Sequence, residues 1–200
     1  GIEPDLVYLP ERAFDMQTFF KDVRAALAKH PNVVVAVSEG IRFADGHYVG
    51  EGTQTGVKDA FGHVYLAGTG KALELAIKAE IGCKVRSIEL NLPQRCAAHL
   101  ASATDIFESV ETGKFAVKTA EQGITRQMIT AIRGSGEAYA ITFEPKDVSE
   151  IANKIRYVDD AFINVEGNHV TNACCKYLLP LIQGEVKCEY QNGLPVHIIL

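Results

Sequence analysis

The chain has no long apolar run, no excess of positive charge and no cysteines or histidines at metal-ligand spacing. None of its apolar stretches approaches the roughly 18 residues of a membrane-spanning helix. Its 20 basic and 25 acidic residues give a net charge of −5, so no global field attracts nucleic acid or an anionic membrane. Any site for an anion must therefore be a local cluster.

The five cysteines are an odd number, and their spacing is not that of metal ligands. Cys174 and Cys175 are adjacent and cannot form an ordinary disulfide with each other. We expect reduced, buried thiols in a cytoplasmic protein, because the first residues do not show the basic-then-apolar layout of a signal peptide. No nucleophile elbow is present, and His63 and His99 have no partners at metal spacing.

The 200 residues, 47% of them hydrophobic, suit one α/β domain or one large domain with an insertion. Residues 5–9 predict a buried strand, 14–30 an amphipathic helix, and 33–37 (VVVAV) a strand buried on both faces. A helix at about 70–81 and a strand at 84–90 predict a second step of the same kind. The expected fold is therefore a Rossmann-like, three-layer α/β structure, with helices on both faces of a parallel or mixed sheet.

Between and beyond these steps the pattern is less regular. Seven glycines from Gly40 to Gly68 predict an irregular insertion over about 41–68. The remaining expected elements are a helix from Ser102 or Thr104 to about Gln122, a hairpin of 127–133 and 137–143, a short helix from Asp147, a helix at 170–182 and a β-like tail at 194–200.

The most informative stretch is 84–95, KVRSIELNLPQR, which has Arg86 at the start of its expected strand and Arg95 beyond a turn. Glu39 follows the buried strand and precedes Gly40. Ligands of α/β sheets bind outside the carboxyl ends of strands, and arginine can hold a phosphate through two parallel hydrogen bonds. We predict that Arg86 and Arg95 hold a sugar phosphate and that Glu39 accepts from sugar hydroxyls; the alternative is three solvated surface side chains.

Other candidate groups are weaker. The sequence GTGK at 68–71 is similar to a phosphate loop, but its first glycine is missing and Ala72 replaces the Ser or Thr that would hold magnesium. The possible bases fit helix starts or solvated loops equally well; they are Asp59, Asp105, Asp159 and Asp160. The residues alone therefore predict a sugar-phosphate-binding or anion-binding α/β domain without a visible catalytic centre.

Four segments are similar to the phosphofructokinase family, and within it to the pyrophosphate-dependent branch. They are LPE at 9–11, VVVAVSEG at 33–40, DAFGH at 59–63 and KVRSIELNLPQRCAAHLASATD at 84–105, in the family's order and spacing. The resemblance implies a glycolytic and gluconeogenic phosphotransferase that converts fructose 6-phosphate to fructose 1,6-bisphosphate. It implies Mg²⁺ as cofactor and pyrophosphate as donor, with ATP as the alternative.

The same resemblance assigns roles to three residues. Glu39 is similar to the family's ligand of fructose 6-phosphate hydroxyls, and Arg95 to the arginine that closes the sugar-phosphate pocket. Arg86 is similar to an arginine that reaches a neighbouring subunit's pocket, which implies a homo-oligomer with a shared site. In extended chain, Arg86 and Arg95 would lie more than roughly 20 Å apart. Leu92 stands where many ATP-dependent members have a histidine ligand.

The family's donor-site segments do not occur in this sequence: the Gly-rich phosphate loop, the GGDD-type turn and the TIDND-like segment with its catalytic aspartate. We therefore expect residues 1–200 to be the C-terminal half, without catalytic residues or metal ligands and inactive alone. The N-terminal half would supply donor site, magnesium and base. The alternatives are a stand-alone sugar-phosphate-binding module and a domain that serves only subunit assembly.

Overall fold

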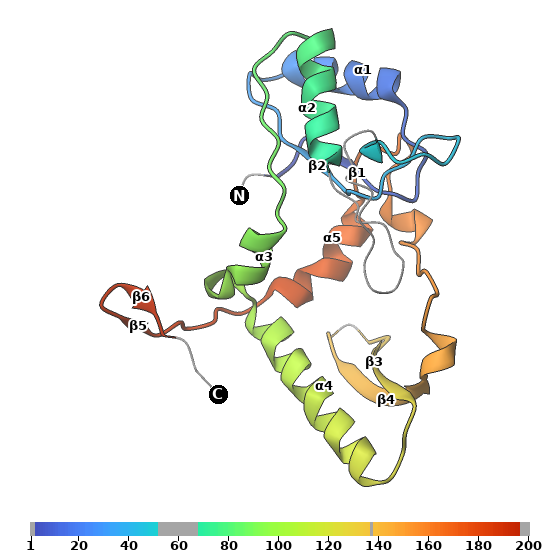
Figure 1. The fold of residues 1–200 in the computed structure, drawn as a ribbon, viewed down its shortest axis with the longest axis vertical. Coiled ribbons are helices and arrows are strands. Elements are labelled where there is room, and N and C mark those ends of the chain that lie inside the picture. Colours follow the sequence, from blue (N-terminus) through green and yellow to red (C-terminus); the bar gives the residue numbers. More distant parts are fainter. Residues whose placement is uncertain (1–2, 52–67, 137, 197–200) are drawn as a thin grey trace. The chain divides into compact units, whose positions relative to one another are not determined.

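The computed structural model describes residues 3–51, 68–136 and 138–196, which form two compact units (Figure 1). Unit 1 contains Gly1–Leu90 and Tyr157–Cys174, and unit 2 contains Asn91–Arg156 and Cys175–Leu200. Within the described ranges, no helix combines the length and the apolar character that crossing a membrane requires.

Unit 1 begins with the predicted strand, helix and strand. Strand β1 (Leu6–Tyr8) pairs in parallel with β2 (Val35–Val37), and helix α1 (Met16–Leu27) connects them (Figure 1). The helix begins after Asp15, whose Oδ1 accepts a hydrogen bond of 2.8 Å from the Thr18 backbone N–H. The predicted parallel βαβ step is confirmed, with a helix somewhat shorter than expected.

The core of unit 1 is built around Phe19, which is 1% exposed. Its ring lies 5.5 Å from that of Tyr8 and 5.4 Å from that of Phe14, centroid to centroid. Ile41 and Val49 are also buried in this core, so the first part of the expected irregular insertion is firmly anchored. Residues 52–67 of that insertion lie outside the described residues.

Helix α2 (Thr69–Glu80) confirms the helix predicted at about 70–81 and covers the same core with Leu73 and Ile77. It begins after Gly68, which has a φ of 86°. At its other end Gly82 has a φ of 76° and its N–H donates to the Ile77 carbonyl at 3.2 Å. A glycine is suited to this left-handed position, so the expected C-terminal glycine is also confirmed.

Two expectations about strands in unit 1 are wrong. Residues 84–90 form no strand; they run as irregular extended chain (Figure 1), since they pair with no strand in the described residues. Their backbone is held at Ser87, whose N–H donates to the Glu74 side chain of α2. Ile88 and Leu90, two of the apolar residues of the expected strand, are 80% and 63% exposed. Strand β2 is half-buried and not covered on both faces. The parallel sheet that the described residues form therefore has two strands, within an α/β structure.

Unit 2 contains α3 (Leu92–Cys96), the 3₁₀ turn η2 (Ala98–Leu100) and the long helix α4 (Ala103–Glu121) (Figure 1). Ser102 is the N-cap of α4, since its Oγ accepts from the Asp105 N–H at 3.0 Å. The predicted hairpin is confirmed as β3 (Gln127–Arg133) and β4 (Ile141–Asp147), the second strand starting later than expected. It packs on α4 through Phe143 and Phe115, whose ring centroids are 6.1 Å apart.

The remaining elements are short. The helix expected at 170–182 is present as α5 (Asn172–Leu178) followed by the 3₁₀ turn η5 (Leu179–Ile182), which contains Pro180. None of the five cysteines, all within the described residues, forms a disulfide. Only Cys174 is buried, and Cys96 and Cys175 are exposed, so the expectation of buried thiols holds for one. The other short elements are η3 (Val148–Glu150), η4 (Asp160–Phe162), β5 (Tyr190–Gln191) and β6 (Leu194–Pro195).

Candidate functional site

The candidate site of unit 1 lies where β2 ends. Beyond Val37 the chain turns at Ser38, Glu39 and Gly40, and the Glu39 side chain is exposed. The Thr69 hydroxyl, itself buried, donates to the Glu39 carbonyl at 3.0 Å and ties this turn to the first residue of α2. A Cβ on Gly40 would lie 3.7 Å from the Cβ of Pro10, so the turn after β1 is its neighbour. The carboxyl ends of both parallel strands thus meet the start of a helix, the position in which α/β structures bind ligands.

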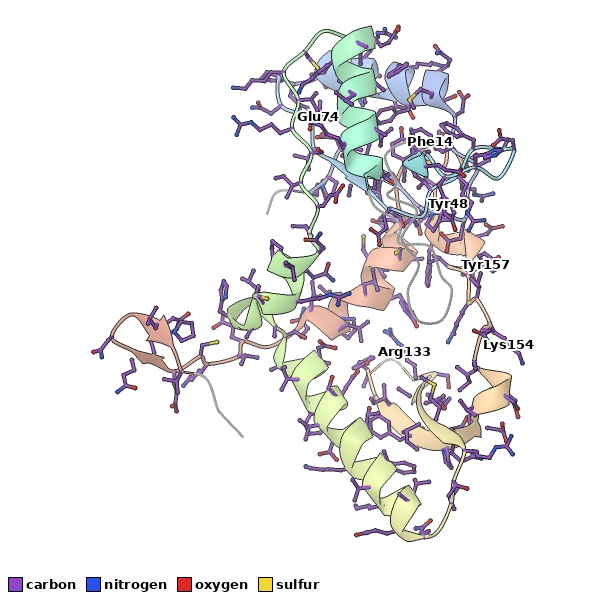
Figure 2. All side chains as sticks on the ribbon, viewed as in Figure 1. Phe14, Tyr48, Glu74, Arg133, Lys154 and Tyr157 are labelled. Atoms are coloured by element: carbon purple, nitrogen blue, oxygen red, sulfur yellow. The ribbon has the colours of Figure 1, made fainter. Side chains whose placement is uncertain are left out.

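The same helix holds the extended segment that carries Arg86. Glu74 lies on α2 (Figure 2). It is only 8% exposed and accepts from the Ser87 N–H at 3.0 Å and from the Ser87 hydroxyl at 2.6 Å. Its other carboxylate oxygen accepts from Lys78 Nζ at 2.5 Å and Lys71 Nζ at 3.0 Å. The hydrogen bonds from Lys78, Ser87 and Lys71 hold the pKa of Glu74 far below its usual range, so this carboxylate stays ionised.

Near the start of α2, the Gly68 N–H and the Lys71 ammonium group are both bound to carboxylates of the protein. The Gly68 N–H donates to Glu89 Oε1 at 3.2 Å, and Lys71 is paired with Glu74. A Cβ on Gly70 would lie only 3.3 Å from the Ser87 Cβ, so glycine permits close packing here. The glycines of the GTGK sequence therefore have a structural explanation, and the similarity to a phosphate loop is not needed to account for them.

The three predicted site residues divide between the two units. Glu39 and Arg86 belong to unit 1: the Glu39 carbonyl is bound by Thr69 of α2, and Arg86 precedes Ser87, which is bound by Glu74. Arg95 lies in the last turn of α3 in unit 2, and all three side chains are exposed. Leu92 begins α3 and is 68% exposed.

Sequence reasoning missed Glu74. A detectable signal was present, because Glu74 lies beside Leu73 and three residues before Ile77, on the helix face that these residues bury. Lysines three residues before it and four residues after it can pair with such a carboxylate. An acidic residue in this position on a buried face needs partners, which here include the segment of Arg86.

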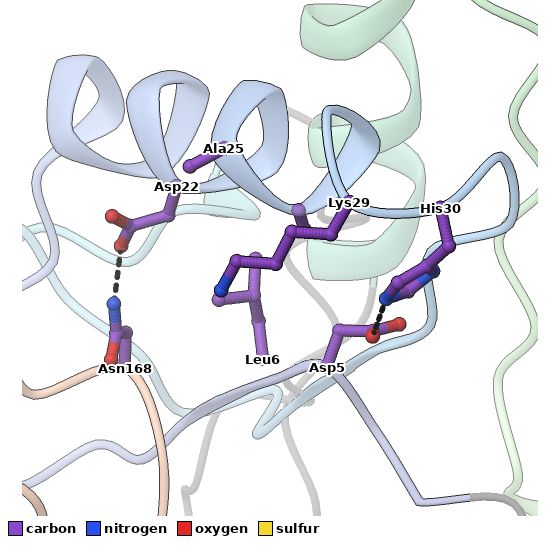
Figure 3. A pocket seen from close by; sticks show the side chains of 8 residues that line it. Asp5, Leu6, Asp22, Ala25, Lys29, His30 and Asn168 are labelled. Atoms are coloured by element: carbon purple, nitrogen blue, oxygen red, sulfur yellow. Dashed lines mark hydrogen bonds and ion pairs between the residues drawn. The ribbon is translucent and has the colours of Figure 1, made fainter.

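A groove of about 150 Å³ lies between α1 and β1, and its polar groups bind one another (Figure 3). His30 Nε2 pairs with Asp5 Oδ1 at 2.8 Å. Asp22 Oδ2 accepts from Asn168 Nδ2 at 2.9 Å and from the Tyr8 hydroxyl at 2.8 Å. Burial and Asp22 together raise the pKa of Tyr8. These contacts give the groove a structural role in joining the Asn168 segment to α1.

No three His, Cys, Asp or Glu side chains gather in a way that could hold a metal ion within residues 3–51, 68–136 and 138–196. The described residues therefore offer no cluster of side chains to which a magnesium ion could be assigned. In unit 1, one exposed carboxylate, that of Glu39, and one exposed guanidinium group, that of Arg86, lie on segments bound to α2; side chains of these kinds can bind hydroxyl and phosphate groups.

The sequence is similar to that of known proteins over nearly the whole chain. The chain is 37% identical over 195 residues to the pyrophosphate–fructose 6-phosphate 1-phosphotransferase of Halomonas elongata, covering 98% of this chain and 46% of that protein. It is 35% identical over 195 residues to the protein of that name from Methylococcus capsulatus, with the same coverage. No model of a protein family matches the chain.

A solved structure agrees with these relatives. The pyrophosphate-dependent phosphofructokinase of Nitrosospira multiformis matches with a TM-score of 0.79 and 29% identity, covering 98% of this chain and 45% of that chain. The α/β class is thereby confirmed. The chain spans about half the length of the curated relatives it matches, in agreement with the expectation that it corresponds to half of such an enzyme.

Proposed function

Since the chain belongs to the family of the pyrophosphate-dependent phosphofructokinases, we propose that it is the C-terminal, fructose 6-phosphate-binding half of a pyrophosphate–fructose 6-phosphate 1-phosphotransferase. The observation that carries this proposal is the match of 98% of the chain to relatives of that name. The position of Glu39 at the carboxyl end of a parallel strand supports it.

Each residue of the site has a defined task in this proposal. The Glu39 carboxylate accepts hydrogen bonds from hydroxyls of the sugar, and Arg86 and Arg95 neutralise its 6-phosphate. Phosphoryl transfer depends mainly on positioning and on stabilising the charge that spreads over the transferred group. This half holds the acceptor, so that the attacking hydroxyl of the sugar is directed at the donor.

The other half of the enzyme supplies the rest of the reaction. It holds pyrophosphate, the Mg²⁺ ion that neutralises the donor's charge, and the base that orients the sugar hydroxyl. ATP is the second candidate donor, and the names of the relatives favour pyrophosphate. The enzyme is a homo-oligomer of the cytoplasm in which two subunits share one substrate site through Arg86.

The 200-residue chain alone is expected to bind fructose 6-phosphate and to give no turnover with pyrophosphate or ATP, because the proposal places donor site and base elsewhere. Isothermal titration calorimetry measures binding, and a coupled assay for fructose 1,6-bisphosphate measures turnover with each donor. Turnover above background would contradict the assignment of the donor site and the base to the other half of the enzyme. Absence of fructose 6-phosphate binding would favour a domain that serves only assembly.

The Arg95→Ala variant is expected to weaken fructose 6-phosphate binding by about 10- to 150-fold and to leave fructose binding nearly unchanged. A charge-assisted hydrogen-bonded contact contributes about 1.5–3 kcal/mol and requires the phosphate. Calorimetry with both ligands measures the two effects. Arg156→Ala is the matched control, since it removes another exposed arginine of unit 2. Equal losses for both ligands would show that Arg95 does not contact the phosphate.

A further inference from the structure

Glu74 is a buried, ionised carboxylate that the substrate roles above do not use. We propose that Glu74 is a positioning residue for the sugar-phosphate site, and that it acts by fixing Ser87 so that Arg86 faces outward. This inference rests on the proposed role of Arg86. It adds a residue of α2 that touches no ligand but determines how the ligand's arginine is presented.

The contact between Glu74 and Ser87 is built from two bonds on one oxygen. Glu74 Oε2 accepts from both the backbone N–H and the hydroxyl of Ser87, so it fixes main chain and side chain together. The two lysines bind the opposite oxygen, Oε1. The carboxylate thus has four donors, and its full charge is compensated although its side chain is 9% exposed.

The direction of Arg86 follows from the position of Ser87. Side chains alternate between opposite sides along extended backbone. Val85 and Ser87 are half-buried, and Val85 packs against the core of unit 1, whereas Lys84 and Arg86 are exposed. A slip of one residue would turn Arg86 toward α2 and move Ser87 away from Glu74. Holding Ser87 inward therefore keeps Arg86 outward.

This direct anchor matters because residues 84–90 pair with no strand in the part of the chain that the structure describes. Glu74 of α2 supplies a side-chain acceptor for the Ser87 backbone N–H in place of a ladder bond. A second bond, from the Gly68 N–H to Glu89, fixes the following residues at the start of the helix. Because Thr69 also binds the Glu39 carbonyl, α2 helps to position both proposed ligand residues of unit 1, Glu39 and Arg86.

The test is a double-mutant cycle in the 200-residue chain, with fructose 6-phosphate and fructose as probes in calorimetry. Arg86→Ala is expected to weaken fructose 6-phosphate binding at least tenfold. Glu74→Gln is expected to weaken it by about three- to tenfold, because the neutral amide of the glutamine keeps one acceptor oxygen but loses the ionic bonds to the lysines. In the Arg86→Ala background, Glu74→Gln is expected to have less than a twofold effect. Fructose binding is expected to change less than twofold in both single variants.

Glu80→Gln is the matched control, since it removes an exposed carboxylate from the same helix, where Glu80 pairs with Arg24. It is expected to leave binding unchanged. Ser87→Ala is expected to fall between the wild type and Glu74→Gln, because the backbone bond to Glu74 remains. Hydrogen exchange of the peptide containing Ser87 is expected to accelerate in Glu74→Gln, while exchange of α1 stays slow and shows that the unit remains folded.

The outcomes separate the two proposals. If Arg86→Ala does not change binding, or the unmodified chain does not bind fructose 6-phosphate, the proposed function fails and the inference fails with it. If Arg86→Ala weakens binding but Glu74→Gln does not, or weakens it equally in both backgrounds, the positioning role of Glu74 is wrong and the proposed function stands. Equal losses of fructose and fructose 6-phosphate affinity in Glu74→Gln would indicate a merely structural role.

Discussion

Phe19→Ala is expected to lower the free energy of unfolding of unit 1 by about 3–5 kcal/mol, the range for truncating a buried aromatic side chain. Phe19 is 1% exposed and contacts the rings of Tyr8 and Phe14, which come from β1 and from the segment before α1. Its removal leaves a cavity at the point where helix and strand meet. Urea unfolding followed by hydrogen exchange in peptides of α1 and β1 measures the loss.

The matched control is Phe107→Ala, the same chemical change at a position that is 64% exposed on α4 of unit 2. It is expected to change the stability of unit 1 by less than about 0.5 kcal/mol, as exposed substitutions usually do. An equal loss of unit 1 stability in both variants would show that Phe19 is not the centre of a separate core.

The parts of the fold that could be predicted are those determined by local sequence. Helix α1 follows from apolar residues at helical spacing, and α2 from such a pattern closed by Gly82. The hairpin of β3 and β4 follows from β-rich runs around a glycine turn. These patterns depend on residues that are close in sequence, so the elements that they predict form in the folded chain.

The stretch 84–90 shows why the rest could not be predicted. Its short apolar-leaning run of Val85, Ile88 and Leu90 fits a strand, and this pattern alone does not reveal whether a partner strand is available. In the described residues, Glu74 of α2 binds the Ser87 backbone N–H, and the Gly68 N–H binds the Glu89 side chain. The anchor is therefore tertiary, and exposed and half-buried residues alternate from Lys84 to Ile88 without a strand.

For the candidate site too, some features could be predicted from the sequence and others could not. The sequence predicted that Glu39 would follow a parallel strand, and the pairing of β1 with β2 confirms that placement. The roles of Glu39, Arg86 and Arg95 remain predictions. The estimate of more than roughly 20 Å between the two arginines assumed extended chain, whereas Leu92–Cys96 is helical and rises only about 1.5 Å per residue. The shared-site hypothesis now depends on family resemblance and needs a direct test.

That test mixes an Arg86→Ala chain with an Arg95→Ala chain, and fructose 6-phosphate binding is expected to return in part. If each pocket combines Arg86 of one subunit with Arg95 of another, a hybrid dimer contains one pocket without either arginine and one intact pocket. In an equal mixture that exchanges freely, about half of the dimers are hybrid, so about a quarter of the pockets recover wild-type affinity. Calorimetry measures this fraction as the stoichiometry of the tight phase, after native mass spectrometry has shown exchange.

The control mixes the Arg86→Ala chain with the Arg86→Ala/Arg95→Ala double variant, a mixture in which no pocket can hold both arginines and no tight phase is expected. Sharing also links binding to association, because a ligand that needs two subunits must strengthen their association by the same factor by which association strengthens its binding. Sedimentation of the wild-type chain with and without fructose 6-phosphate measures this factor, which Arg86→Ala is expected to reduce toward one. If exchanged mixtures bind no better than either single variant and the ligand leaves association unchanged, Arg86 does not serve a neighbour's pocket. The arginine would then act, if at all, within its own subunit, where α2 holds its segment and Glu39 in one frame.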